Sequence, residues 1–168
     1  MMRTKVINDS ADLVSIIRAF DDTIKKDVFL EICKDWIPVS SITEKFGSKG
    51  EDALELFDKM KLAETKWTTP EDGVKGKPQK MYRSFYSLFN INISCPVNEI
   101  SDIFNVSALD QDVFEKLEDE IYEFIGDDGK FVNTVSENFR ISNTALKALV
   151  RRSNRFAYTG LKLLRNTE

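Results

Sequence analysis

The segment FRISNTALKALVRRSNRFAYTGLKLL, residues 139–164, contains a capped helix followed by a short alternating stretch. Ser142 is of a residue type that caps helix N-termini, and Leu146 and Leu149 recur at the spacing of one helix face. The alternating residues that follow predict two short strands that turn at Thr159-Gly160. With the short helix predicted just before it, the segment predicts the second half of a winged helix-turn-helix.

Seven basic residues and no acidic one lie between Arg140 and Arg165, in a chain whose formal net charge is −4. Such a one-sided segment favours contact with phosphate groups. Lysine and arginine also often only solvate a helix face, and this alternative stays open. We expect Asn143 and Thr144 to read DNA bases, because their side chains hydrogen-bond to base edges. The expected phosphate contacts are Lys147, Arg151, Arg152 and Arg155.

Residues 39–94 have the same outline earlier in the chain. Two short helices are predicted by VSSITEKFG and GEDALELFDKMKLAE, and Gly47 is expected to end the first in a left-handed conformation. Two strands are then predicted by ETKW and QKMYRSFYSLFNINIS, and the loop TTPEDGVKGKP joins them. This order is that of a helix-turn-helix followed by a wing. Two further helices are predicted upstream, over residues 11–20 and in DTIKKDVFLEICKDW.

The first module carries a mixed charge signal. Its second helix contains Glu51, Asp52, Glu55 and Asp58, which a phosphate backbone would repel, so this helix could instead dock onto a protein. Its wing and the start of that helix are better suited to DNA. The expected DNA contacts of this module are Ser48, Lys49, Lys75, Lys77, Lys80 and Arg83.

The composition excludes several classes of enzyme. The chain contains no histidine, so catalytic sites and metal sites that depend on histidine are ruled out. No glycine-rich phosphate-binding motif occurs, and nothing in the sequence indicates catalysis or a cofactor. Cys33 and Cys95 are expected to be structural thiols. No apolar run reaches the length of a membrane span and no secretory leader is recognisable, so we expect a cytoplasmic protein without a membrane partner.

Over residues 10–95 the chain resembles the archaeal members of the ArsR-like winged-helix transcriptional regulators. The resemblance rests on two helices, a turn and a further helix, followed by KLAETKW and the wing GKPQKMYRSFYSLFNINIS. It implies a repressor or activator that binds double-stranded DNA, usually as a homodimer. The Cys-x-Cys of the metal-responsive members has no counterpart, so metal sensing is not expected.

We therefore expect a mostly α-helical α+β chain with small β-hairpins, organised as tandem winged helix-turn-helix modules. Residues 1–94 would form the N-terminal domain, residues 95–107 a connector, and residues 108–168 the C-terminal domain. Two other functions stay open. One is an acidic adaptor that binds a protein partner in a transcription or chromosome-organisation complex, through its acidic helices at 51–58 and 109–125. The other is a domain that binds a small molecule in an aromatic pocket, which only the number of phenylalanines supports. The rings of Tyr82, Phe85, Tyr86 and Phe89 could form a base-stacking platform for single strands, although packing in a core or dimer is the favoured interpretation.

Overall fold

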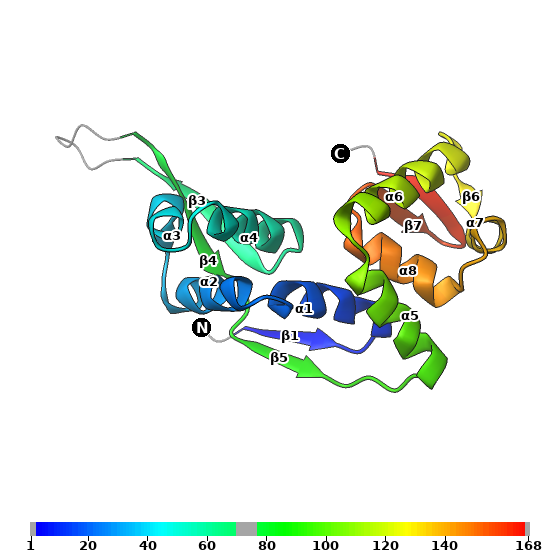
Figure 1. The fold of residues 1–168 in the computed structure, drawn as a ribbon, viewed down its shortest axis with the longest axis horizontal. Helices are drawn as coiled ribbons and strands as arrows, with labels where there is room; N and C mark the ends of the chain where they lie inside the picture. The colour runs from blue at the N-terminus through cyan, green and yellow to red at the C-terminus, as the bar shows by residue number, and fades with distance from the viewer. Residues whose placement is uncertain (1–2, 70–76, 167–168) are drawn as a thin grey trace. The chain divides into compact units, whose positions relative to one another are not determined.

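The computed structural model describes residues 3–69 and 77–166 (Figure 1). Its described residues fall into two compact units. The first unit contains residues 3–6 and 17–91, and the second contains residues 7–16 and 92–166. Helices connected by short strands make up both units, which confirms the predicted α+β class.

The body of the first unit is a three-helix arrangement with a three-stranded antiparallel sheet. Strand β4 lies in the middle of the sheet, between β2 and β3. The hairpin of β3 and β4 pairs from Ala63 with Ser84 to Thr68 with Gln79. The elements are α2 (Thr23–Lys34), β2 (Ile37–Pro38), α3 (Val39–Phe46), α4 (Ser48–Lys59), β3 (Ala63–Thr68) and β4 (Gln79–Ser84).

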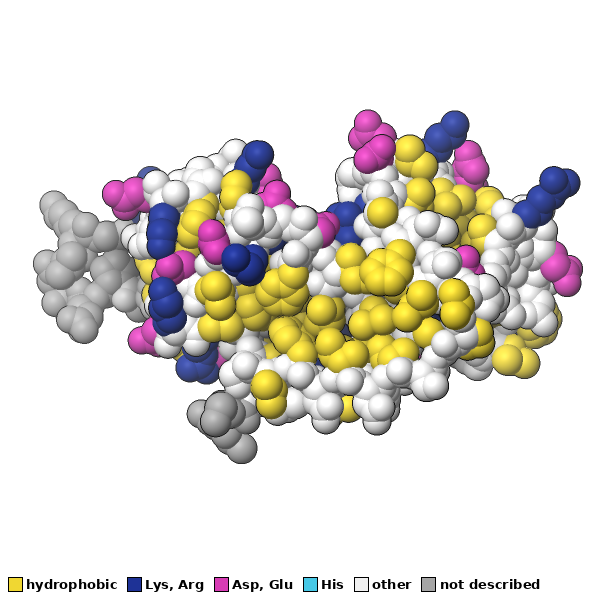
Figure 2. Space-filling view, turned by 60° about the horizontal axis from the view of Figure 1, so that its bottom comes forward, with side chains coloured by type: hydrophobic (Ala, Val, Ile, Leu, Met, Phe, Trp, Pro, Cys, Tyr) yellow, Lys and Arg dark blue, Asp and Glu magenta, His cyan; other side chains and the backbone are white. Residues whose placement is uncertain are grey.

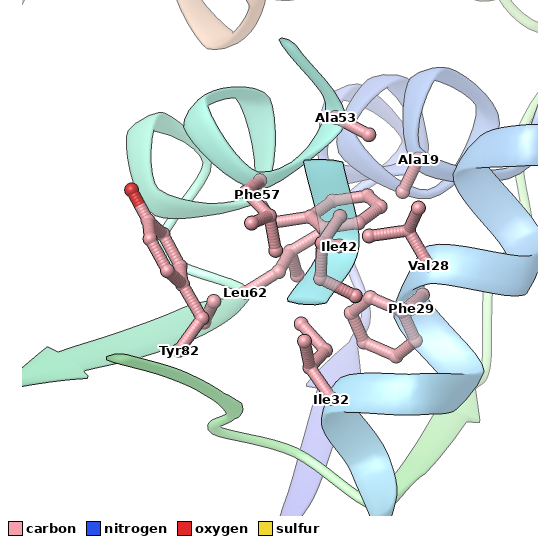
Figure 3. Close-up of a cluster of buried hydrophobic side chains, with 11 residues drawn as sticks. Ala19, Val28, Phe29, Ile32, Ile42, Ala53, Phe57, Leu62 and Tyr82 are labelled. Atoms are coloured by element: carbon pink, nitrogen blue, oxygen red, sulfur yellow. The ribbon is translucent and has the colours of Figure 1, made fainter. Parts of the chain in front are cut away.

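Helices α2, α3 and α4 meet in one apolar core, which Figure 3 shows. Ile32, Ile42 and Phe57 each come from a different helix, and none is more than 2% exposed. The rings of Phe29 and Phe57 meet edge to face, with centroids 5.1 Å apart. Tyr82 of β4 borders this core from the sheet. The core therefore positions α4 and the wing hairpin within the unit.

A tight turn at Gly47 joins α3 to α4. Gly47 ends α3 with a positive φ of 66°, which favours glycine, but its ψ of −158° differs from the left-handed helical conformation expected for it. Gly50 lies where α4 approaches α3 closely, since a β-carbon there would lie 2.7 Å from the Phe46 Cβ and 2.9 Å from the Ile42 Cγ2. Glycine at position 50 thus permits the close packing of the two helices.

The prediction of a single long strand after the wing loop is wrong. Strand β4 ends at Ser84, and β5 (Leu88–Ile91) pairs instead with β1 (Thr4–Ile7) in a separate two-stranded sheet. In the intervening turn the Ser87 amide donates to the Arg3 carbonyl at 2.9 Å. The chain therefore leaves the wing sheet before β5 begins.

The second unit includes an N-terminal segment of the chain. This segment is the 3-10 turn η1 (Ser10–Asp12) and the start of α1 (Leu13–Phe20), which confirms the helix predicted near residues 11–20. Part of the predicted connector is the helix α5 (Val97–Ala108), which packs against α8 (Asn143–Arg152). The remaining elements are α6 (Gln111–Ile125), β6 (Lys130–Phe131), α7 (Val132–Phe139), β7 (Phe156–Thr159) and β8 (Lys162–Arg165).

The two units share one order of elements. In each, a helix is followed by a two-residue strand, two helices and a hairpin. In each sheet the second strand of the hairpin is central and pairs with both other strands, in the orders β2-β4-β3 and β6-β8-β7. Helices α4 and α8 therefore occupy equivalent places in their units.

Candidate nucleic-acid interface

The start of α4 is open to solvent. Ser48 and Lys49 are exposed and follow directly on the turn at Gly47. The first amide groups of a helix lack partners within it and attract anions. The predicted DNA contacts Ser48 and Lys49 thus lie at a helix end that suits a phosphate.

The rest of the exposed face of α4 is acidic. Glu51, Asp52 and Glu55 are exposed, and each adds a negative charge along the helix. Asp58 differs from them, because its carboxylate accepts a hydrogen bond from Lys80 of β4 at 3.1 Å. The acidic character therefore weakens toward the end of α4 that meets the wing.

The wing hairpin places cations on both of its faces. Lys80 faces the helices, where Tyr82 and Asp58 raise the pKa of its ammonium group against the effect of burial. Lys77 is exposed just before the second wing strand, which begins at Gln79. Lys75, also predicted to contact DNA, lies outside the described residues.

The opposite face of the wing holds a cluster around Trp36. The Lys66 Nζ lies 4.2 Å from one ring centroid of Trp36, and the Arg83 Cζ lies 4.7 Å away. Arg83 also donates two hydrogen bonds to Glu64, at 3.0 and 2.6 Å. These bonds, opposed by partial burial, hold the pKa of Glu64 below its usual value. Arg83 is therefore held at the base of the wing by Glu64.

Sequence reasoning missed Trp36 and Lys66 as part of this surface. Lys66 is the fourth residue of β3, and strand alternation places it on the same face as Glu64. That alternation was a usable signal for Lys66. Trp36 comes from the segment after α2, and no pattern in the sequence connects it to the wing.

In the second unit, the cations on the exposed stripe of α8 are paired with acidic residues near the N-terminus. Lys147 binds Asp9, and Arg151 binds Asp12 with its Nε at 2.8 Å from the carboxylate. Burial alone would raise the pKa of Asp9, but hydrogen bonds from Lys147 and the Ala11 amide outweigh it and lower the pKa. A phosphate group would have to compete with these carboxylates.

Of the two predicted base-reading residues of α8, Asn143 is engaged in hydrogen bonds. Asn143 accepts a hydrogen bond from the Ser136 hydroxyl at 2.6 Å and donates one to Asn133 at 3.1 Å. Thr144 is partly buried. Ser142 caps the helix through a hydrogen bond from the Ala145 amide at 2.9 Å, which confirms the predicted cap.

Arg152 does not lie on the surface predicted to meet phosphate. It is 8% exposed, and its guanidinium donates to the Val106 carbonyl at 2.8 Å and lies 4.2 Å from the ring centroid of Phe114. Arg152 lies in the interior, and not on the expected surface, because its side chain is buried against α5 and α6. Arg155 is partly exposed and pairs with Asp119 at 2.5 Å.

The described residues offer no metal site. No group of three or more histidine, cysteine, aspartate or glutamate side chains within them is arranged to hold a metal ion. Cys33 and Cys95 are free thiols, the first exposed and the second partly buried. Among the same residues, no helix has the length and apolar character needed to cross a membrane.

Comparison with known proteins identifies one family. The model of the family described as ArsR transcriptional regulator matches residues 7–166. No curated protein and no solved structure matches the chain.

Proposed function

The chain belongs to the ArsR transcriptional regulator family, and from this premise we propose that it binds duplex DNA through the helix-turn-helix and wing of its first unit. The observation that carries the proposal is the exposed start of α4, at Ser48 and Lys49, in a unit whose wing hairpin bears the exposed cations Lys66 and Lys77. Helix N-termini and wing lysines are groups that grip phosphate oxygens without needing a particular base sequence. No reaction and no metal effector is part of this proposal.

We assign the second unit a lesser share of the binding. The shared order of elements supports a winged-helix module in each unit. On α8, however, Lys147 and Arg151 already have carboxylate partners, and DNA would gain little by replacing one anion with another. We propose only a supporting role in DNA contact for Asn143, Thr144 and Arg155.

Fluorescence anisotropy of a labelled random-sequence duplex, titrated at several salt concentrations, tests the proposal. Replacing Lys77 with alanine should weaken binding to all duplexes alike and reduce the slope of log K against log salt by about one. Lys116→Ala is the matched control, because Lys116 is exposed on α6 of the second unit and its loss changes the net charge equally. Equal effects of the two substitutions, or no binding by the unaltered protein at low salt, would refute the assignment.

We further propose that the protein is a homodimer, with α5 as the contact surface. Figure 2 shows apolar side chains gathered on the face that it presents. On α5, Val97 is 83% exposed and Phe104 is 53% exposed. The stripe of Val97, Ser101, Phe104 and Ala108 carries no charge, so two copies can meet there without repulsion. Light scattering should give a dimer that Phe104→Glu converts to a monomer; a monomer before substitution contradicts the proposal.

The acidic exposed face of α4 supports a second candidate function, an adaptor for a protein partner. Glu51, Asp52 and Glu55 would meet a basic surface by charge complementarity. Reversing these three charges should strengthen binding to random duplex DNA if α4 faces DNA, and should abolish partner capture if α4 faces a protein. Anisotropy and a pull-down with the same variant distinguish the two functions.

A further inference from the structure

Trp67 on the wing strand β3 is the feature that the assigned functions leave unexplained. It is 67% exposed, although tryptophan is usually well buried. It lies directly opposite Lys80 in the hairpin. A large apolar ring therefore stands in solvent beside a cation on the element proposed to grip DNA.

The face of the wing that carries Trp67 is the one turned toward the helices. Side chains of directly paired residues lie on one face, and so do those of residues two apart in a strand. Tyr82, two residues from Lys80, is 2% exposed in the core, and Lys80 itself reaches Asp58 of α4. The face thus begins in the core at Tyr82, continues with Lys80 and ends with Trp67 outside the core.

The other tryptophan of the chain has a structural explanation. Trp36 is stacked with Lys66 and Arg83 at the base of the wing. No ring or cation contact joins Trp67 to the other described residues. The exposed ring of Trp67 therefore suits contact with another molecule better than a role in folding.

We propose that Trp67 packs its ring against the sugars and bases of duplex DNA, next to the phosphates approached by Lys77 and Lys80. This inference rests on the proposed DNA-binding function and adds an apolar contact to it. Aromatic rings stack on the bases of single strands irrespective of sequence, and in duplexes the apolar side chains of minor-groove-binding proteins insert between base steps. Tryptophan is also a residue type that carries a large share of binding energy at interfaces.

The first test compares the affinities of variants for a labelled random duplex by anisotropy. Trp67→Ala should bind about 10-fold more weakly, whereas Trp67→Phe should keep most of the affinity because it keeps a ring. The salt slope should not change, since Trp67 carries no charge. Leu161→Ala is the control: Leu161 is 77% exposed in the second unit, and its removal should leave binding unaltered.

The second test uses the indole itself as the reporter. The chain has two tryptophans, so Trp36→Phe leaves Trp67 as the only one. Adding unlabelled duplex to this variant should quench the indole emission and shift it, and the change should saturate at the concentration that anisotropy gives. Emission that does not respond to saturating duplex would overturn the proposal.

The outcomes separate this proposal from the function on which it rests. If the unaltered protein binds DNA and Trp67→Ala binds within twofold of it, the Trp67 contact is refuted and the DNA-binding function stands. If the unaltered protein does not bind, both fall. If Trp67 emission changes with protein concentration alone, the ring faces a second copy of the chain and the proposal is again refuted.

Discussion

Replacing Arg152 with alanine should destabilise the second unit much more than the same change at Arg151. The two arginines are neighbours in the last turn of α8, so loss of helix propensity and of the favourable charge at the helix end is similar for both. Their environments differ, because Arg152 is 8% exposed whereas the Arg151 side chain is 48% exposed. Comparing the two alanine variants therefore isolates the contribution of burial to the free energy of unfolding.

The size of the effect follows from the contacts of each guanidinium. Arg152 makes a charged hydrogen bond to the Val106 carbonyl, for which about 1.5–3 kcal/mol is typical. Its stacking on Phe114 in a desolvated position adds about 1–2 kcal/mol. We expect a loss of roughly 3–4 kcal/mol for Arg152→Ala. Arg151 makes a surface ion pair with Asp12, so Arg151→Ala should cost about 0–1 kcal/mol.

Urea denaturation followed by far-ultraviolet circular dichroism measures this difference. Both tryptophans belong to the first unit, so tryptophan fluorescence would report on the wrong part of the chain. The midpoint should fall clearly for Arg152→Ala and hardly for Arg151→Ala. Equal losses for the two variants would refute the assignment of Arg152 to the interior.

Three further outcomes are expected. Gly50→Ala should destabilise the first unit by about 1–3 kcal/mol, although alanine has the better helix propensity, because the new methyl group would collide with Phe46. Thermal denaturation measures this loss. Phe57→Ala should cost about 3–5 kcal/mol in the same assay, since Phe57 is fully buried. Glu64→Gln should remove stability that the ionised Glu64 contributes above pH 4.5 and that is lost as the pH falls through its lowered pKa. The unfolding free energies of the two proteins should therefore converge in acid. A difference that stays constant with pH would contradict the role of Arg83.

The helix-turn-helix and the wing of the first unit could be predicted from local patterns. Apolar spacing located α3 and α4, and Gly47 marked the turn between them. Ser142 located the start of α8 in the same way. These signals are local because caps, turns and helix faces depend on residues within about four positions of one another.

The partner of a strand was not predictable in this way. The residues from β4 to β5 form one β-prone run, and alternation gives no sign that the second part pairs with β1 rather than with the wing. Strand pairing between distant segments depends on the packing of the whole unit. The separation of β5 from the wing therefore required the structure.

The charge pattern overstated the free positive charge of α8. The binding of Lys147 to Asp9 joins residues 138 positions apart, and no sequence window contains both. For Arg152 a signal did exist. It follows Ala145, Ala148 and Leu149 at helical spacing, so it shares their buried face. The run of cations in this segment hides the fact that Arg152 belongs to the buried face of the helix.

The membership of residues 7–16 in the second unit has a consequence for biosynthesis. These residues are synthesised before residues 17–91, whereas Lys147 and Arg151, to which Asp9 and Asp12 bind, are synthesised after them. Residues 17–91 can fold in between, since domains generally form as they emerge. A folded first unit shortens the flexible loop that must close, which lowers its entropic cost. Residues 7–16 must therefore wait for their partners, and the second unit is completed only after α8 has been synthesised.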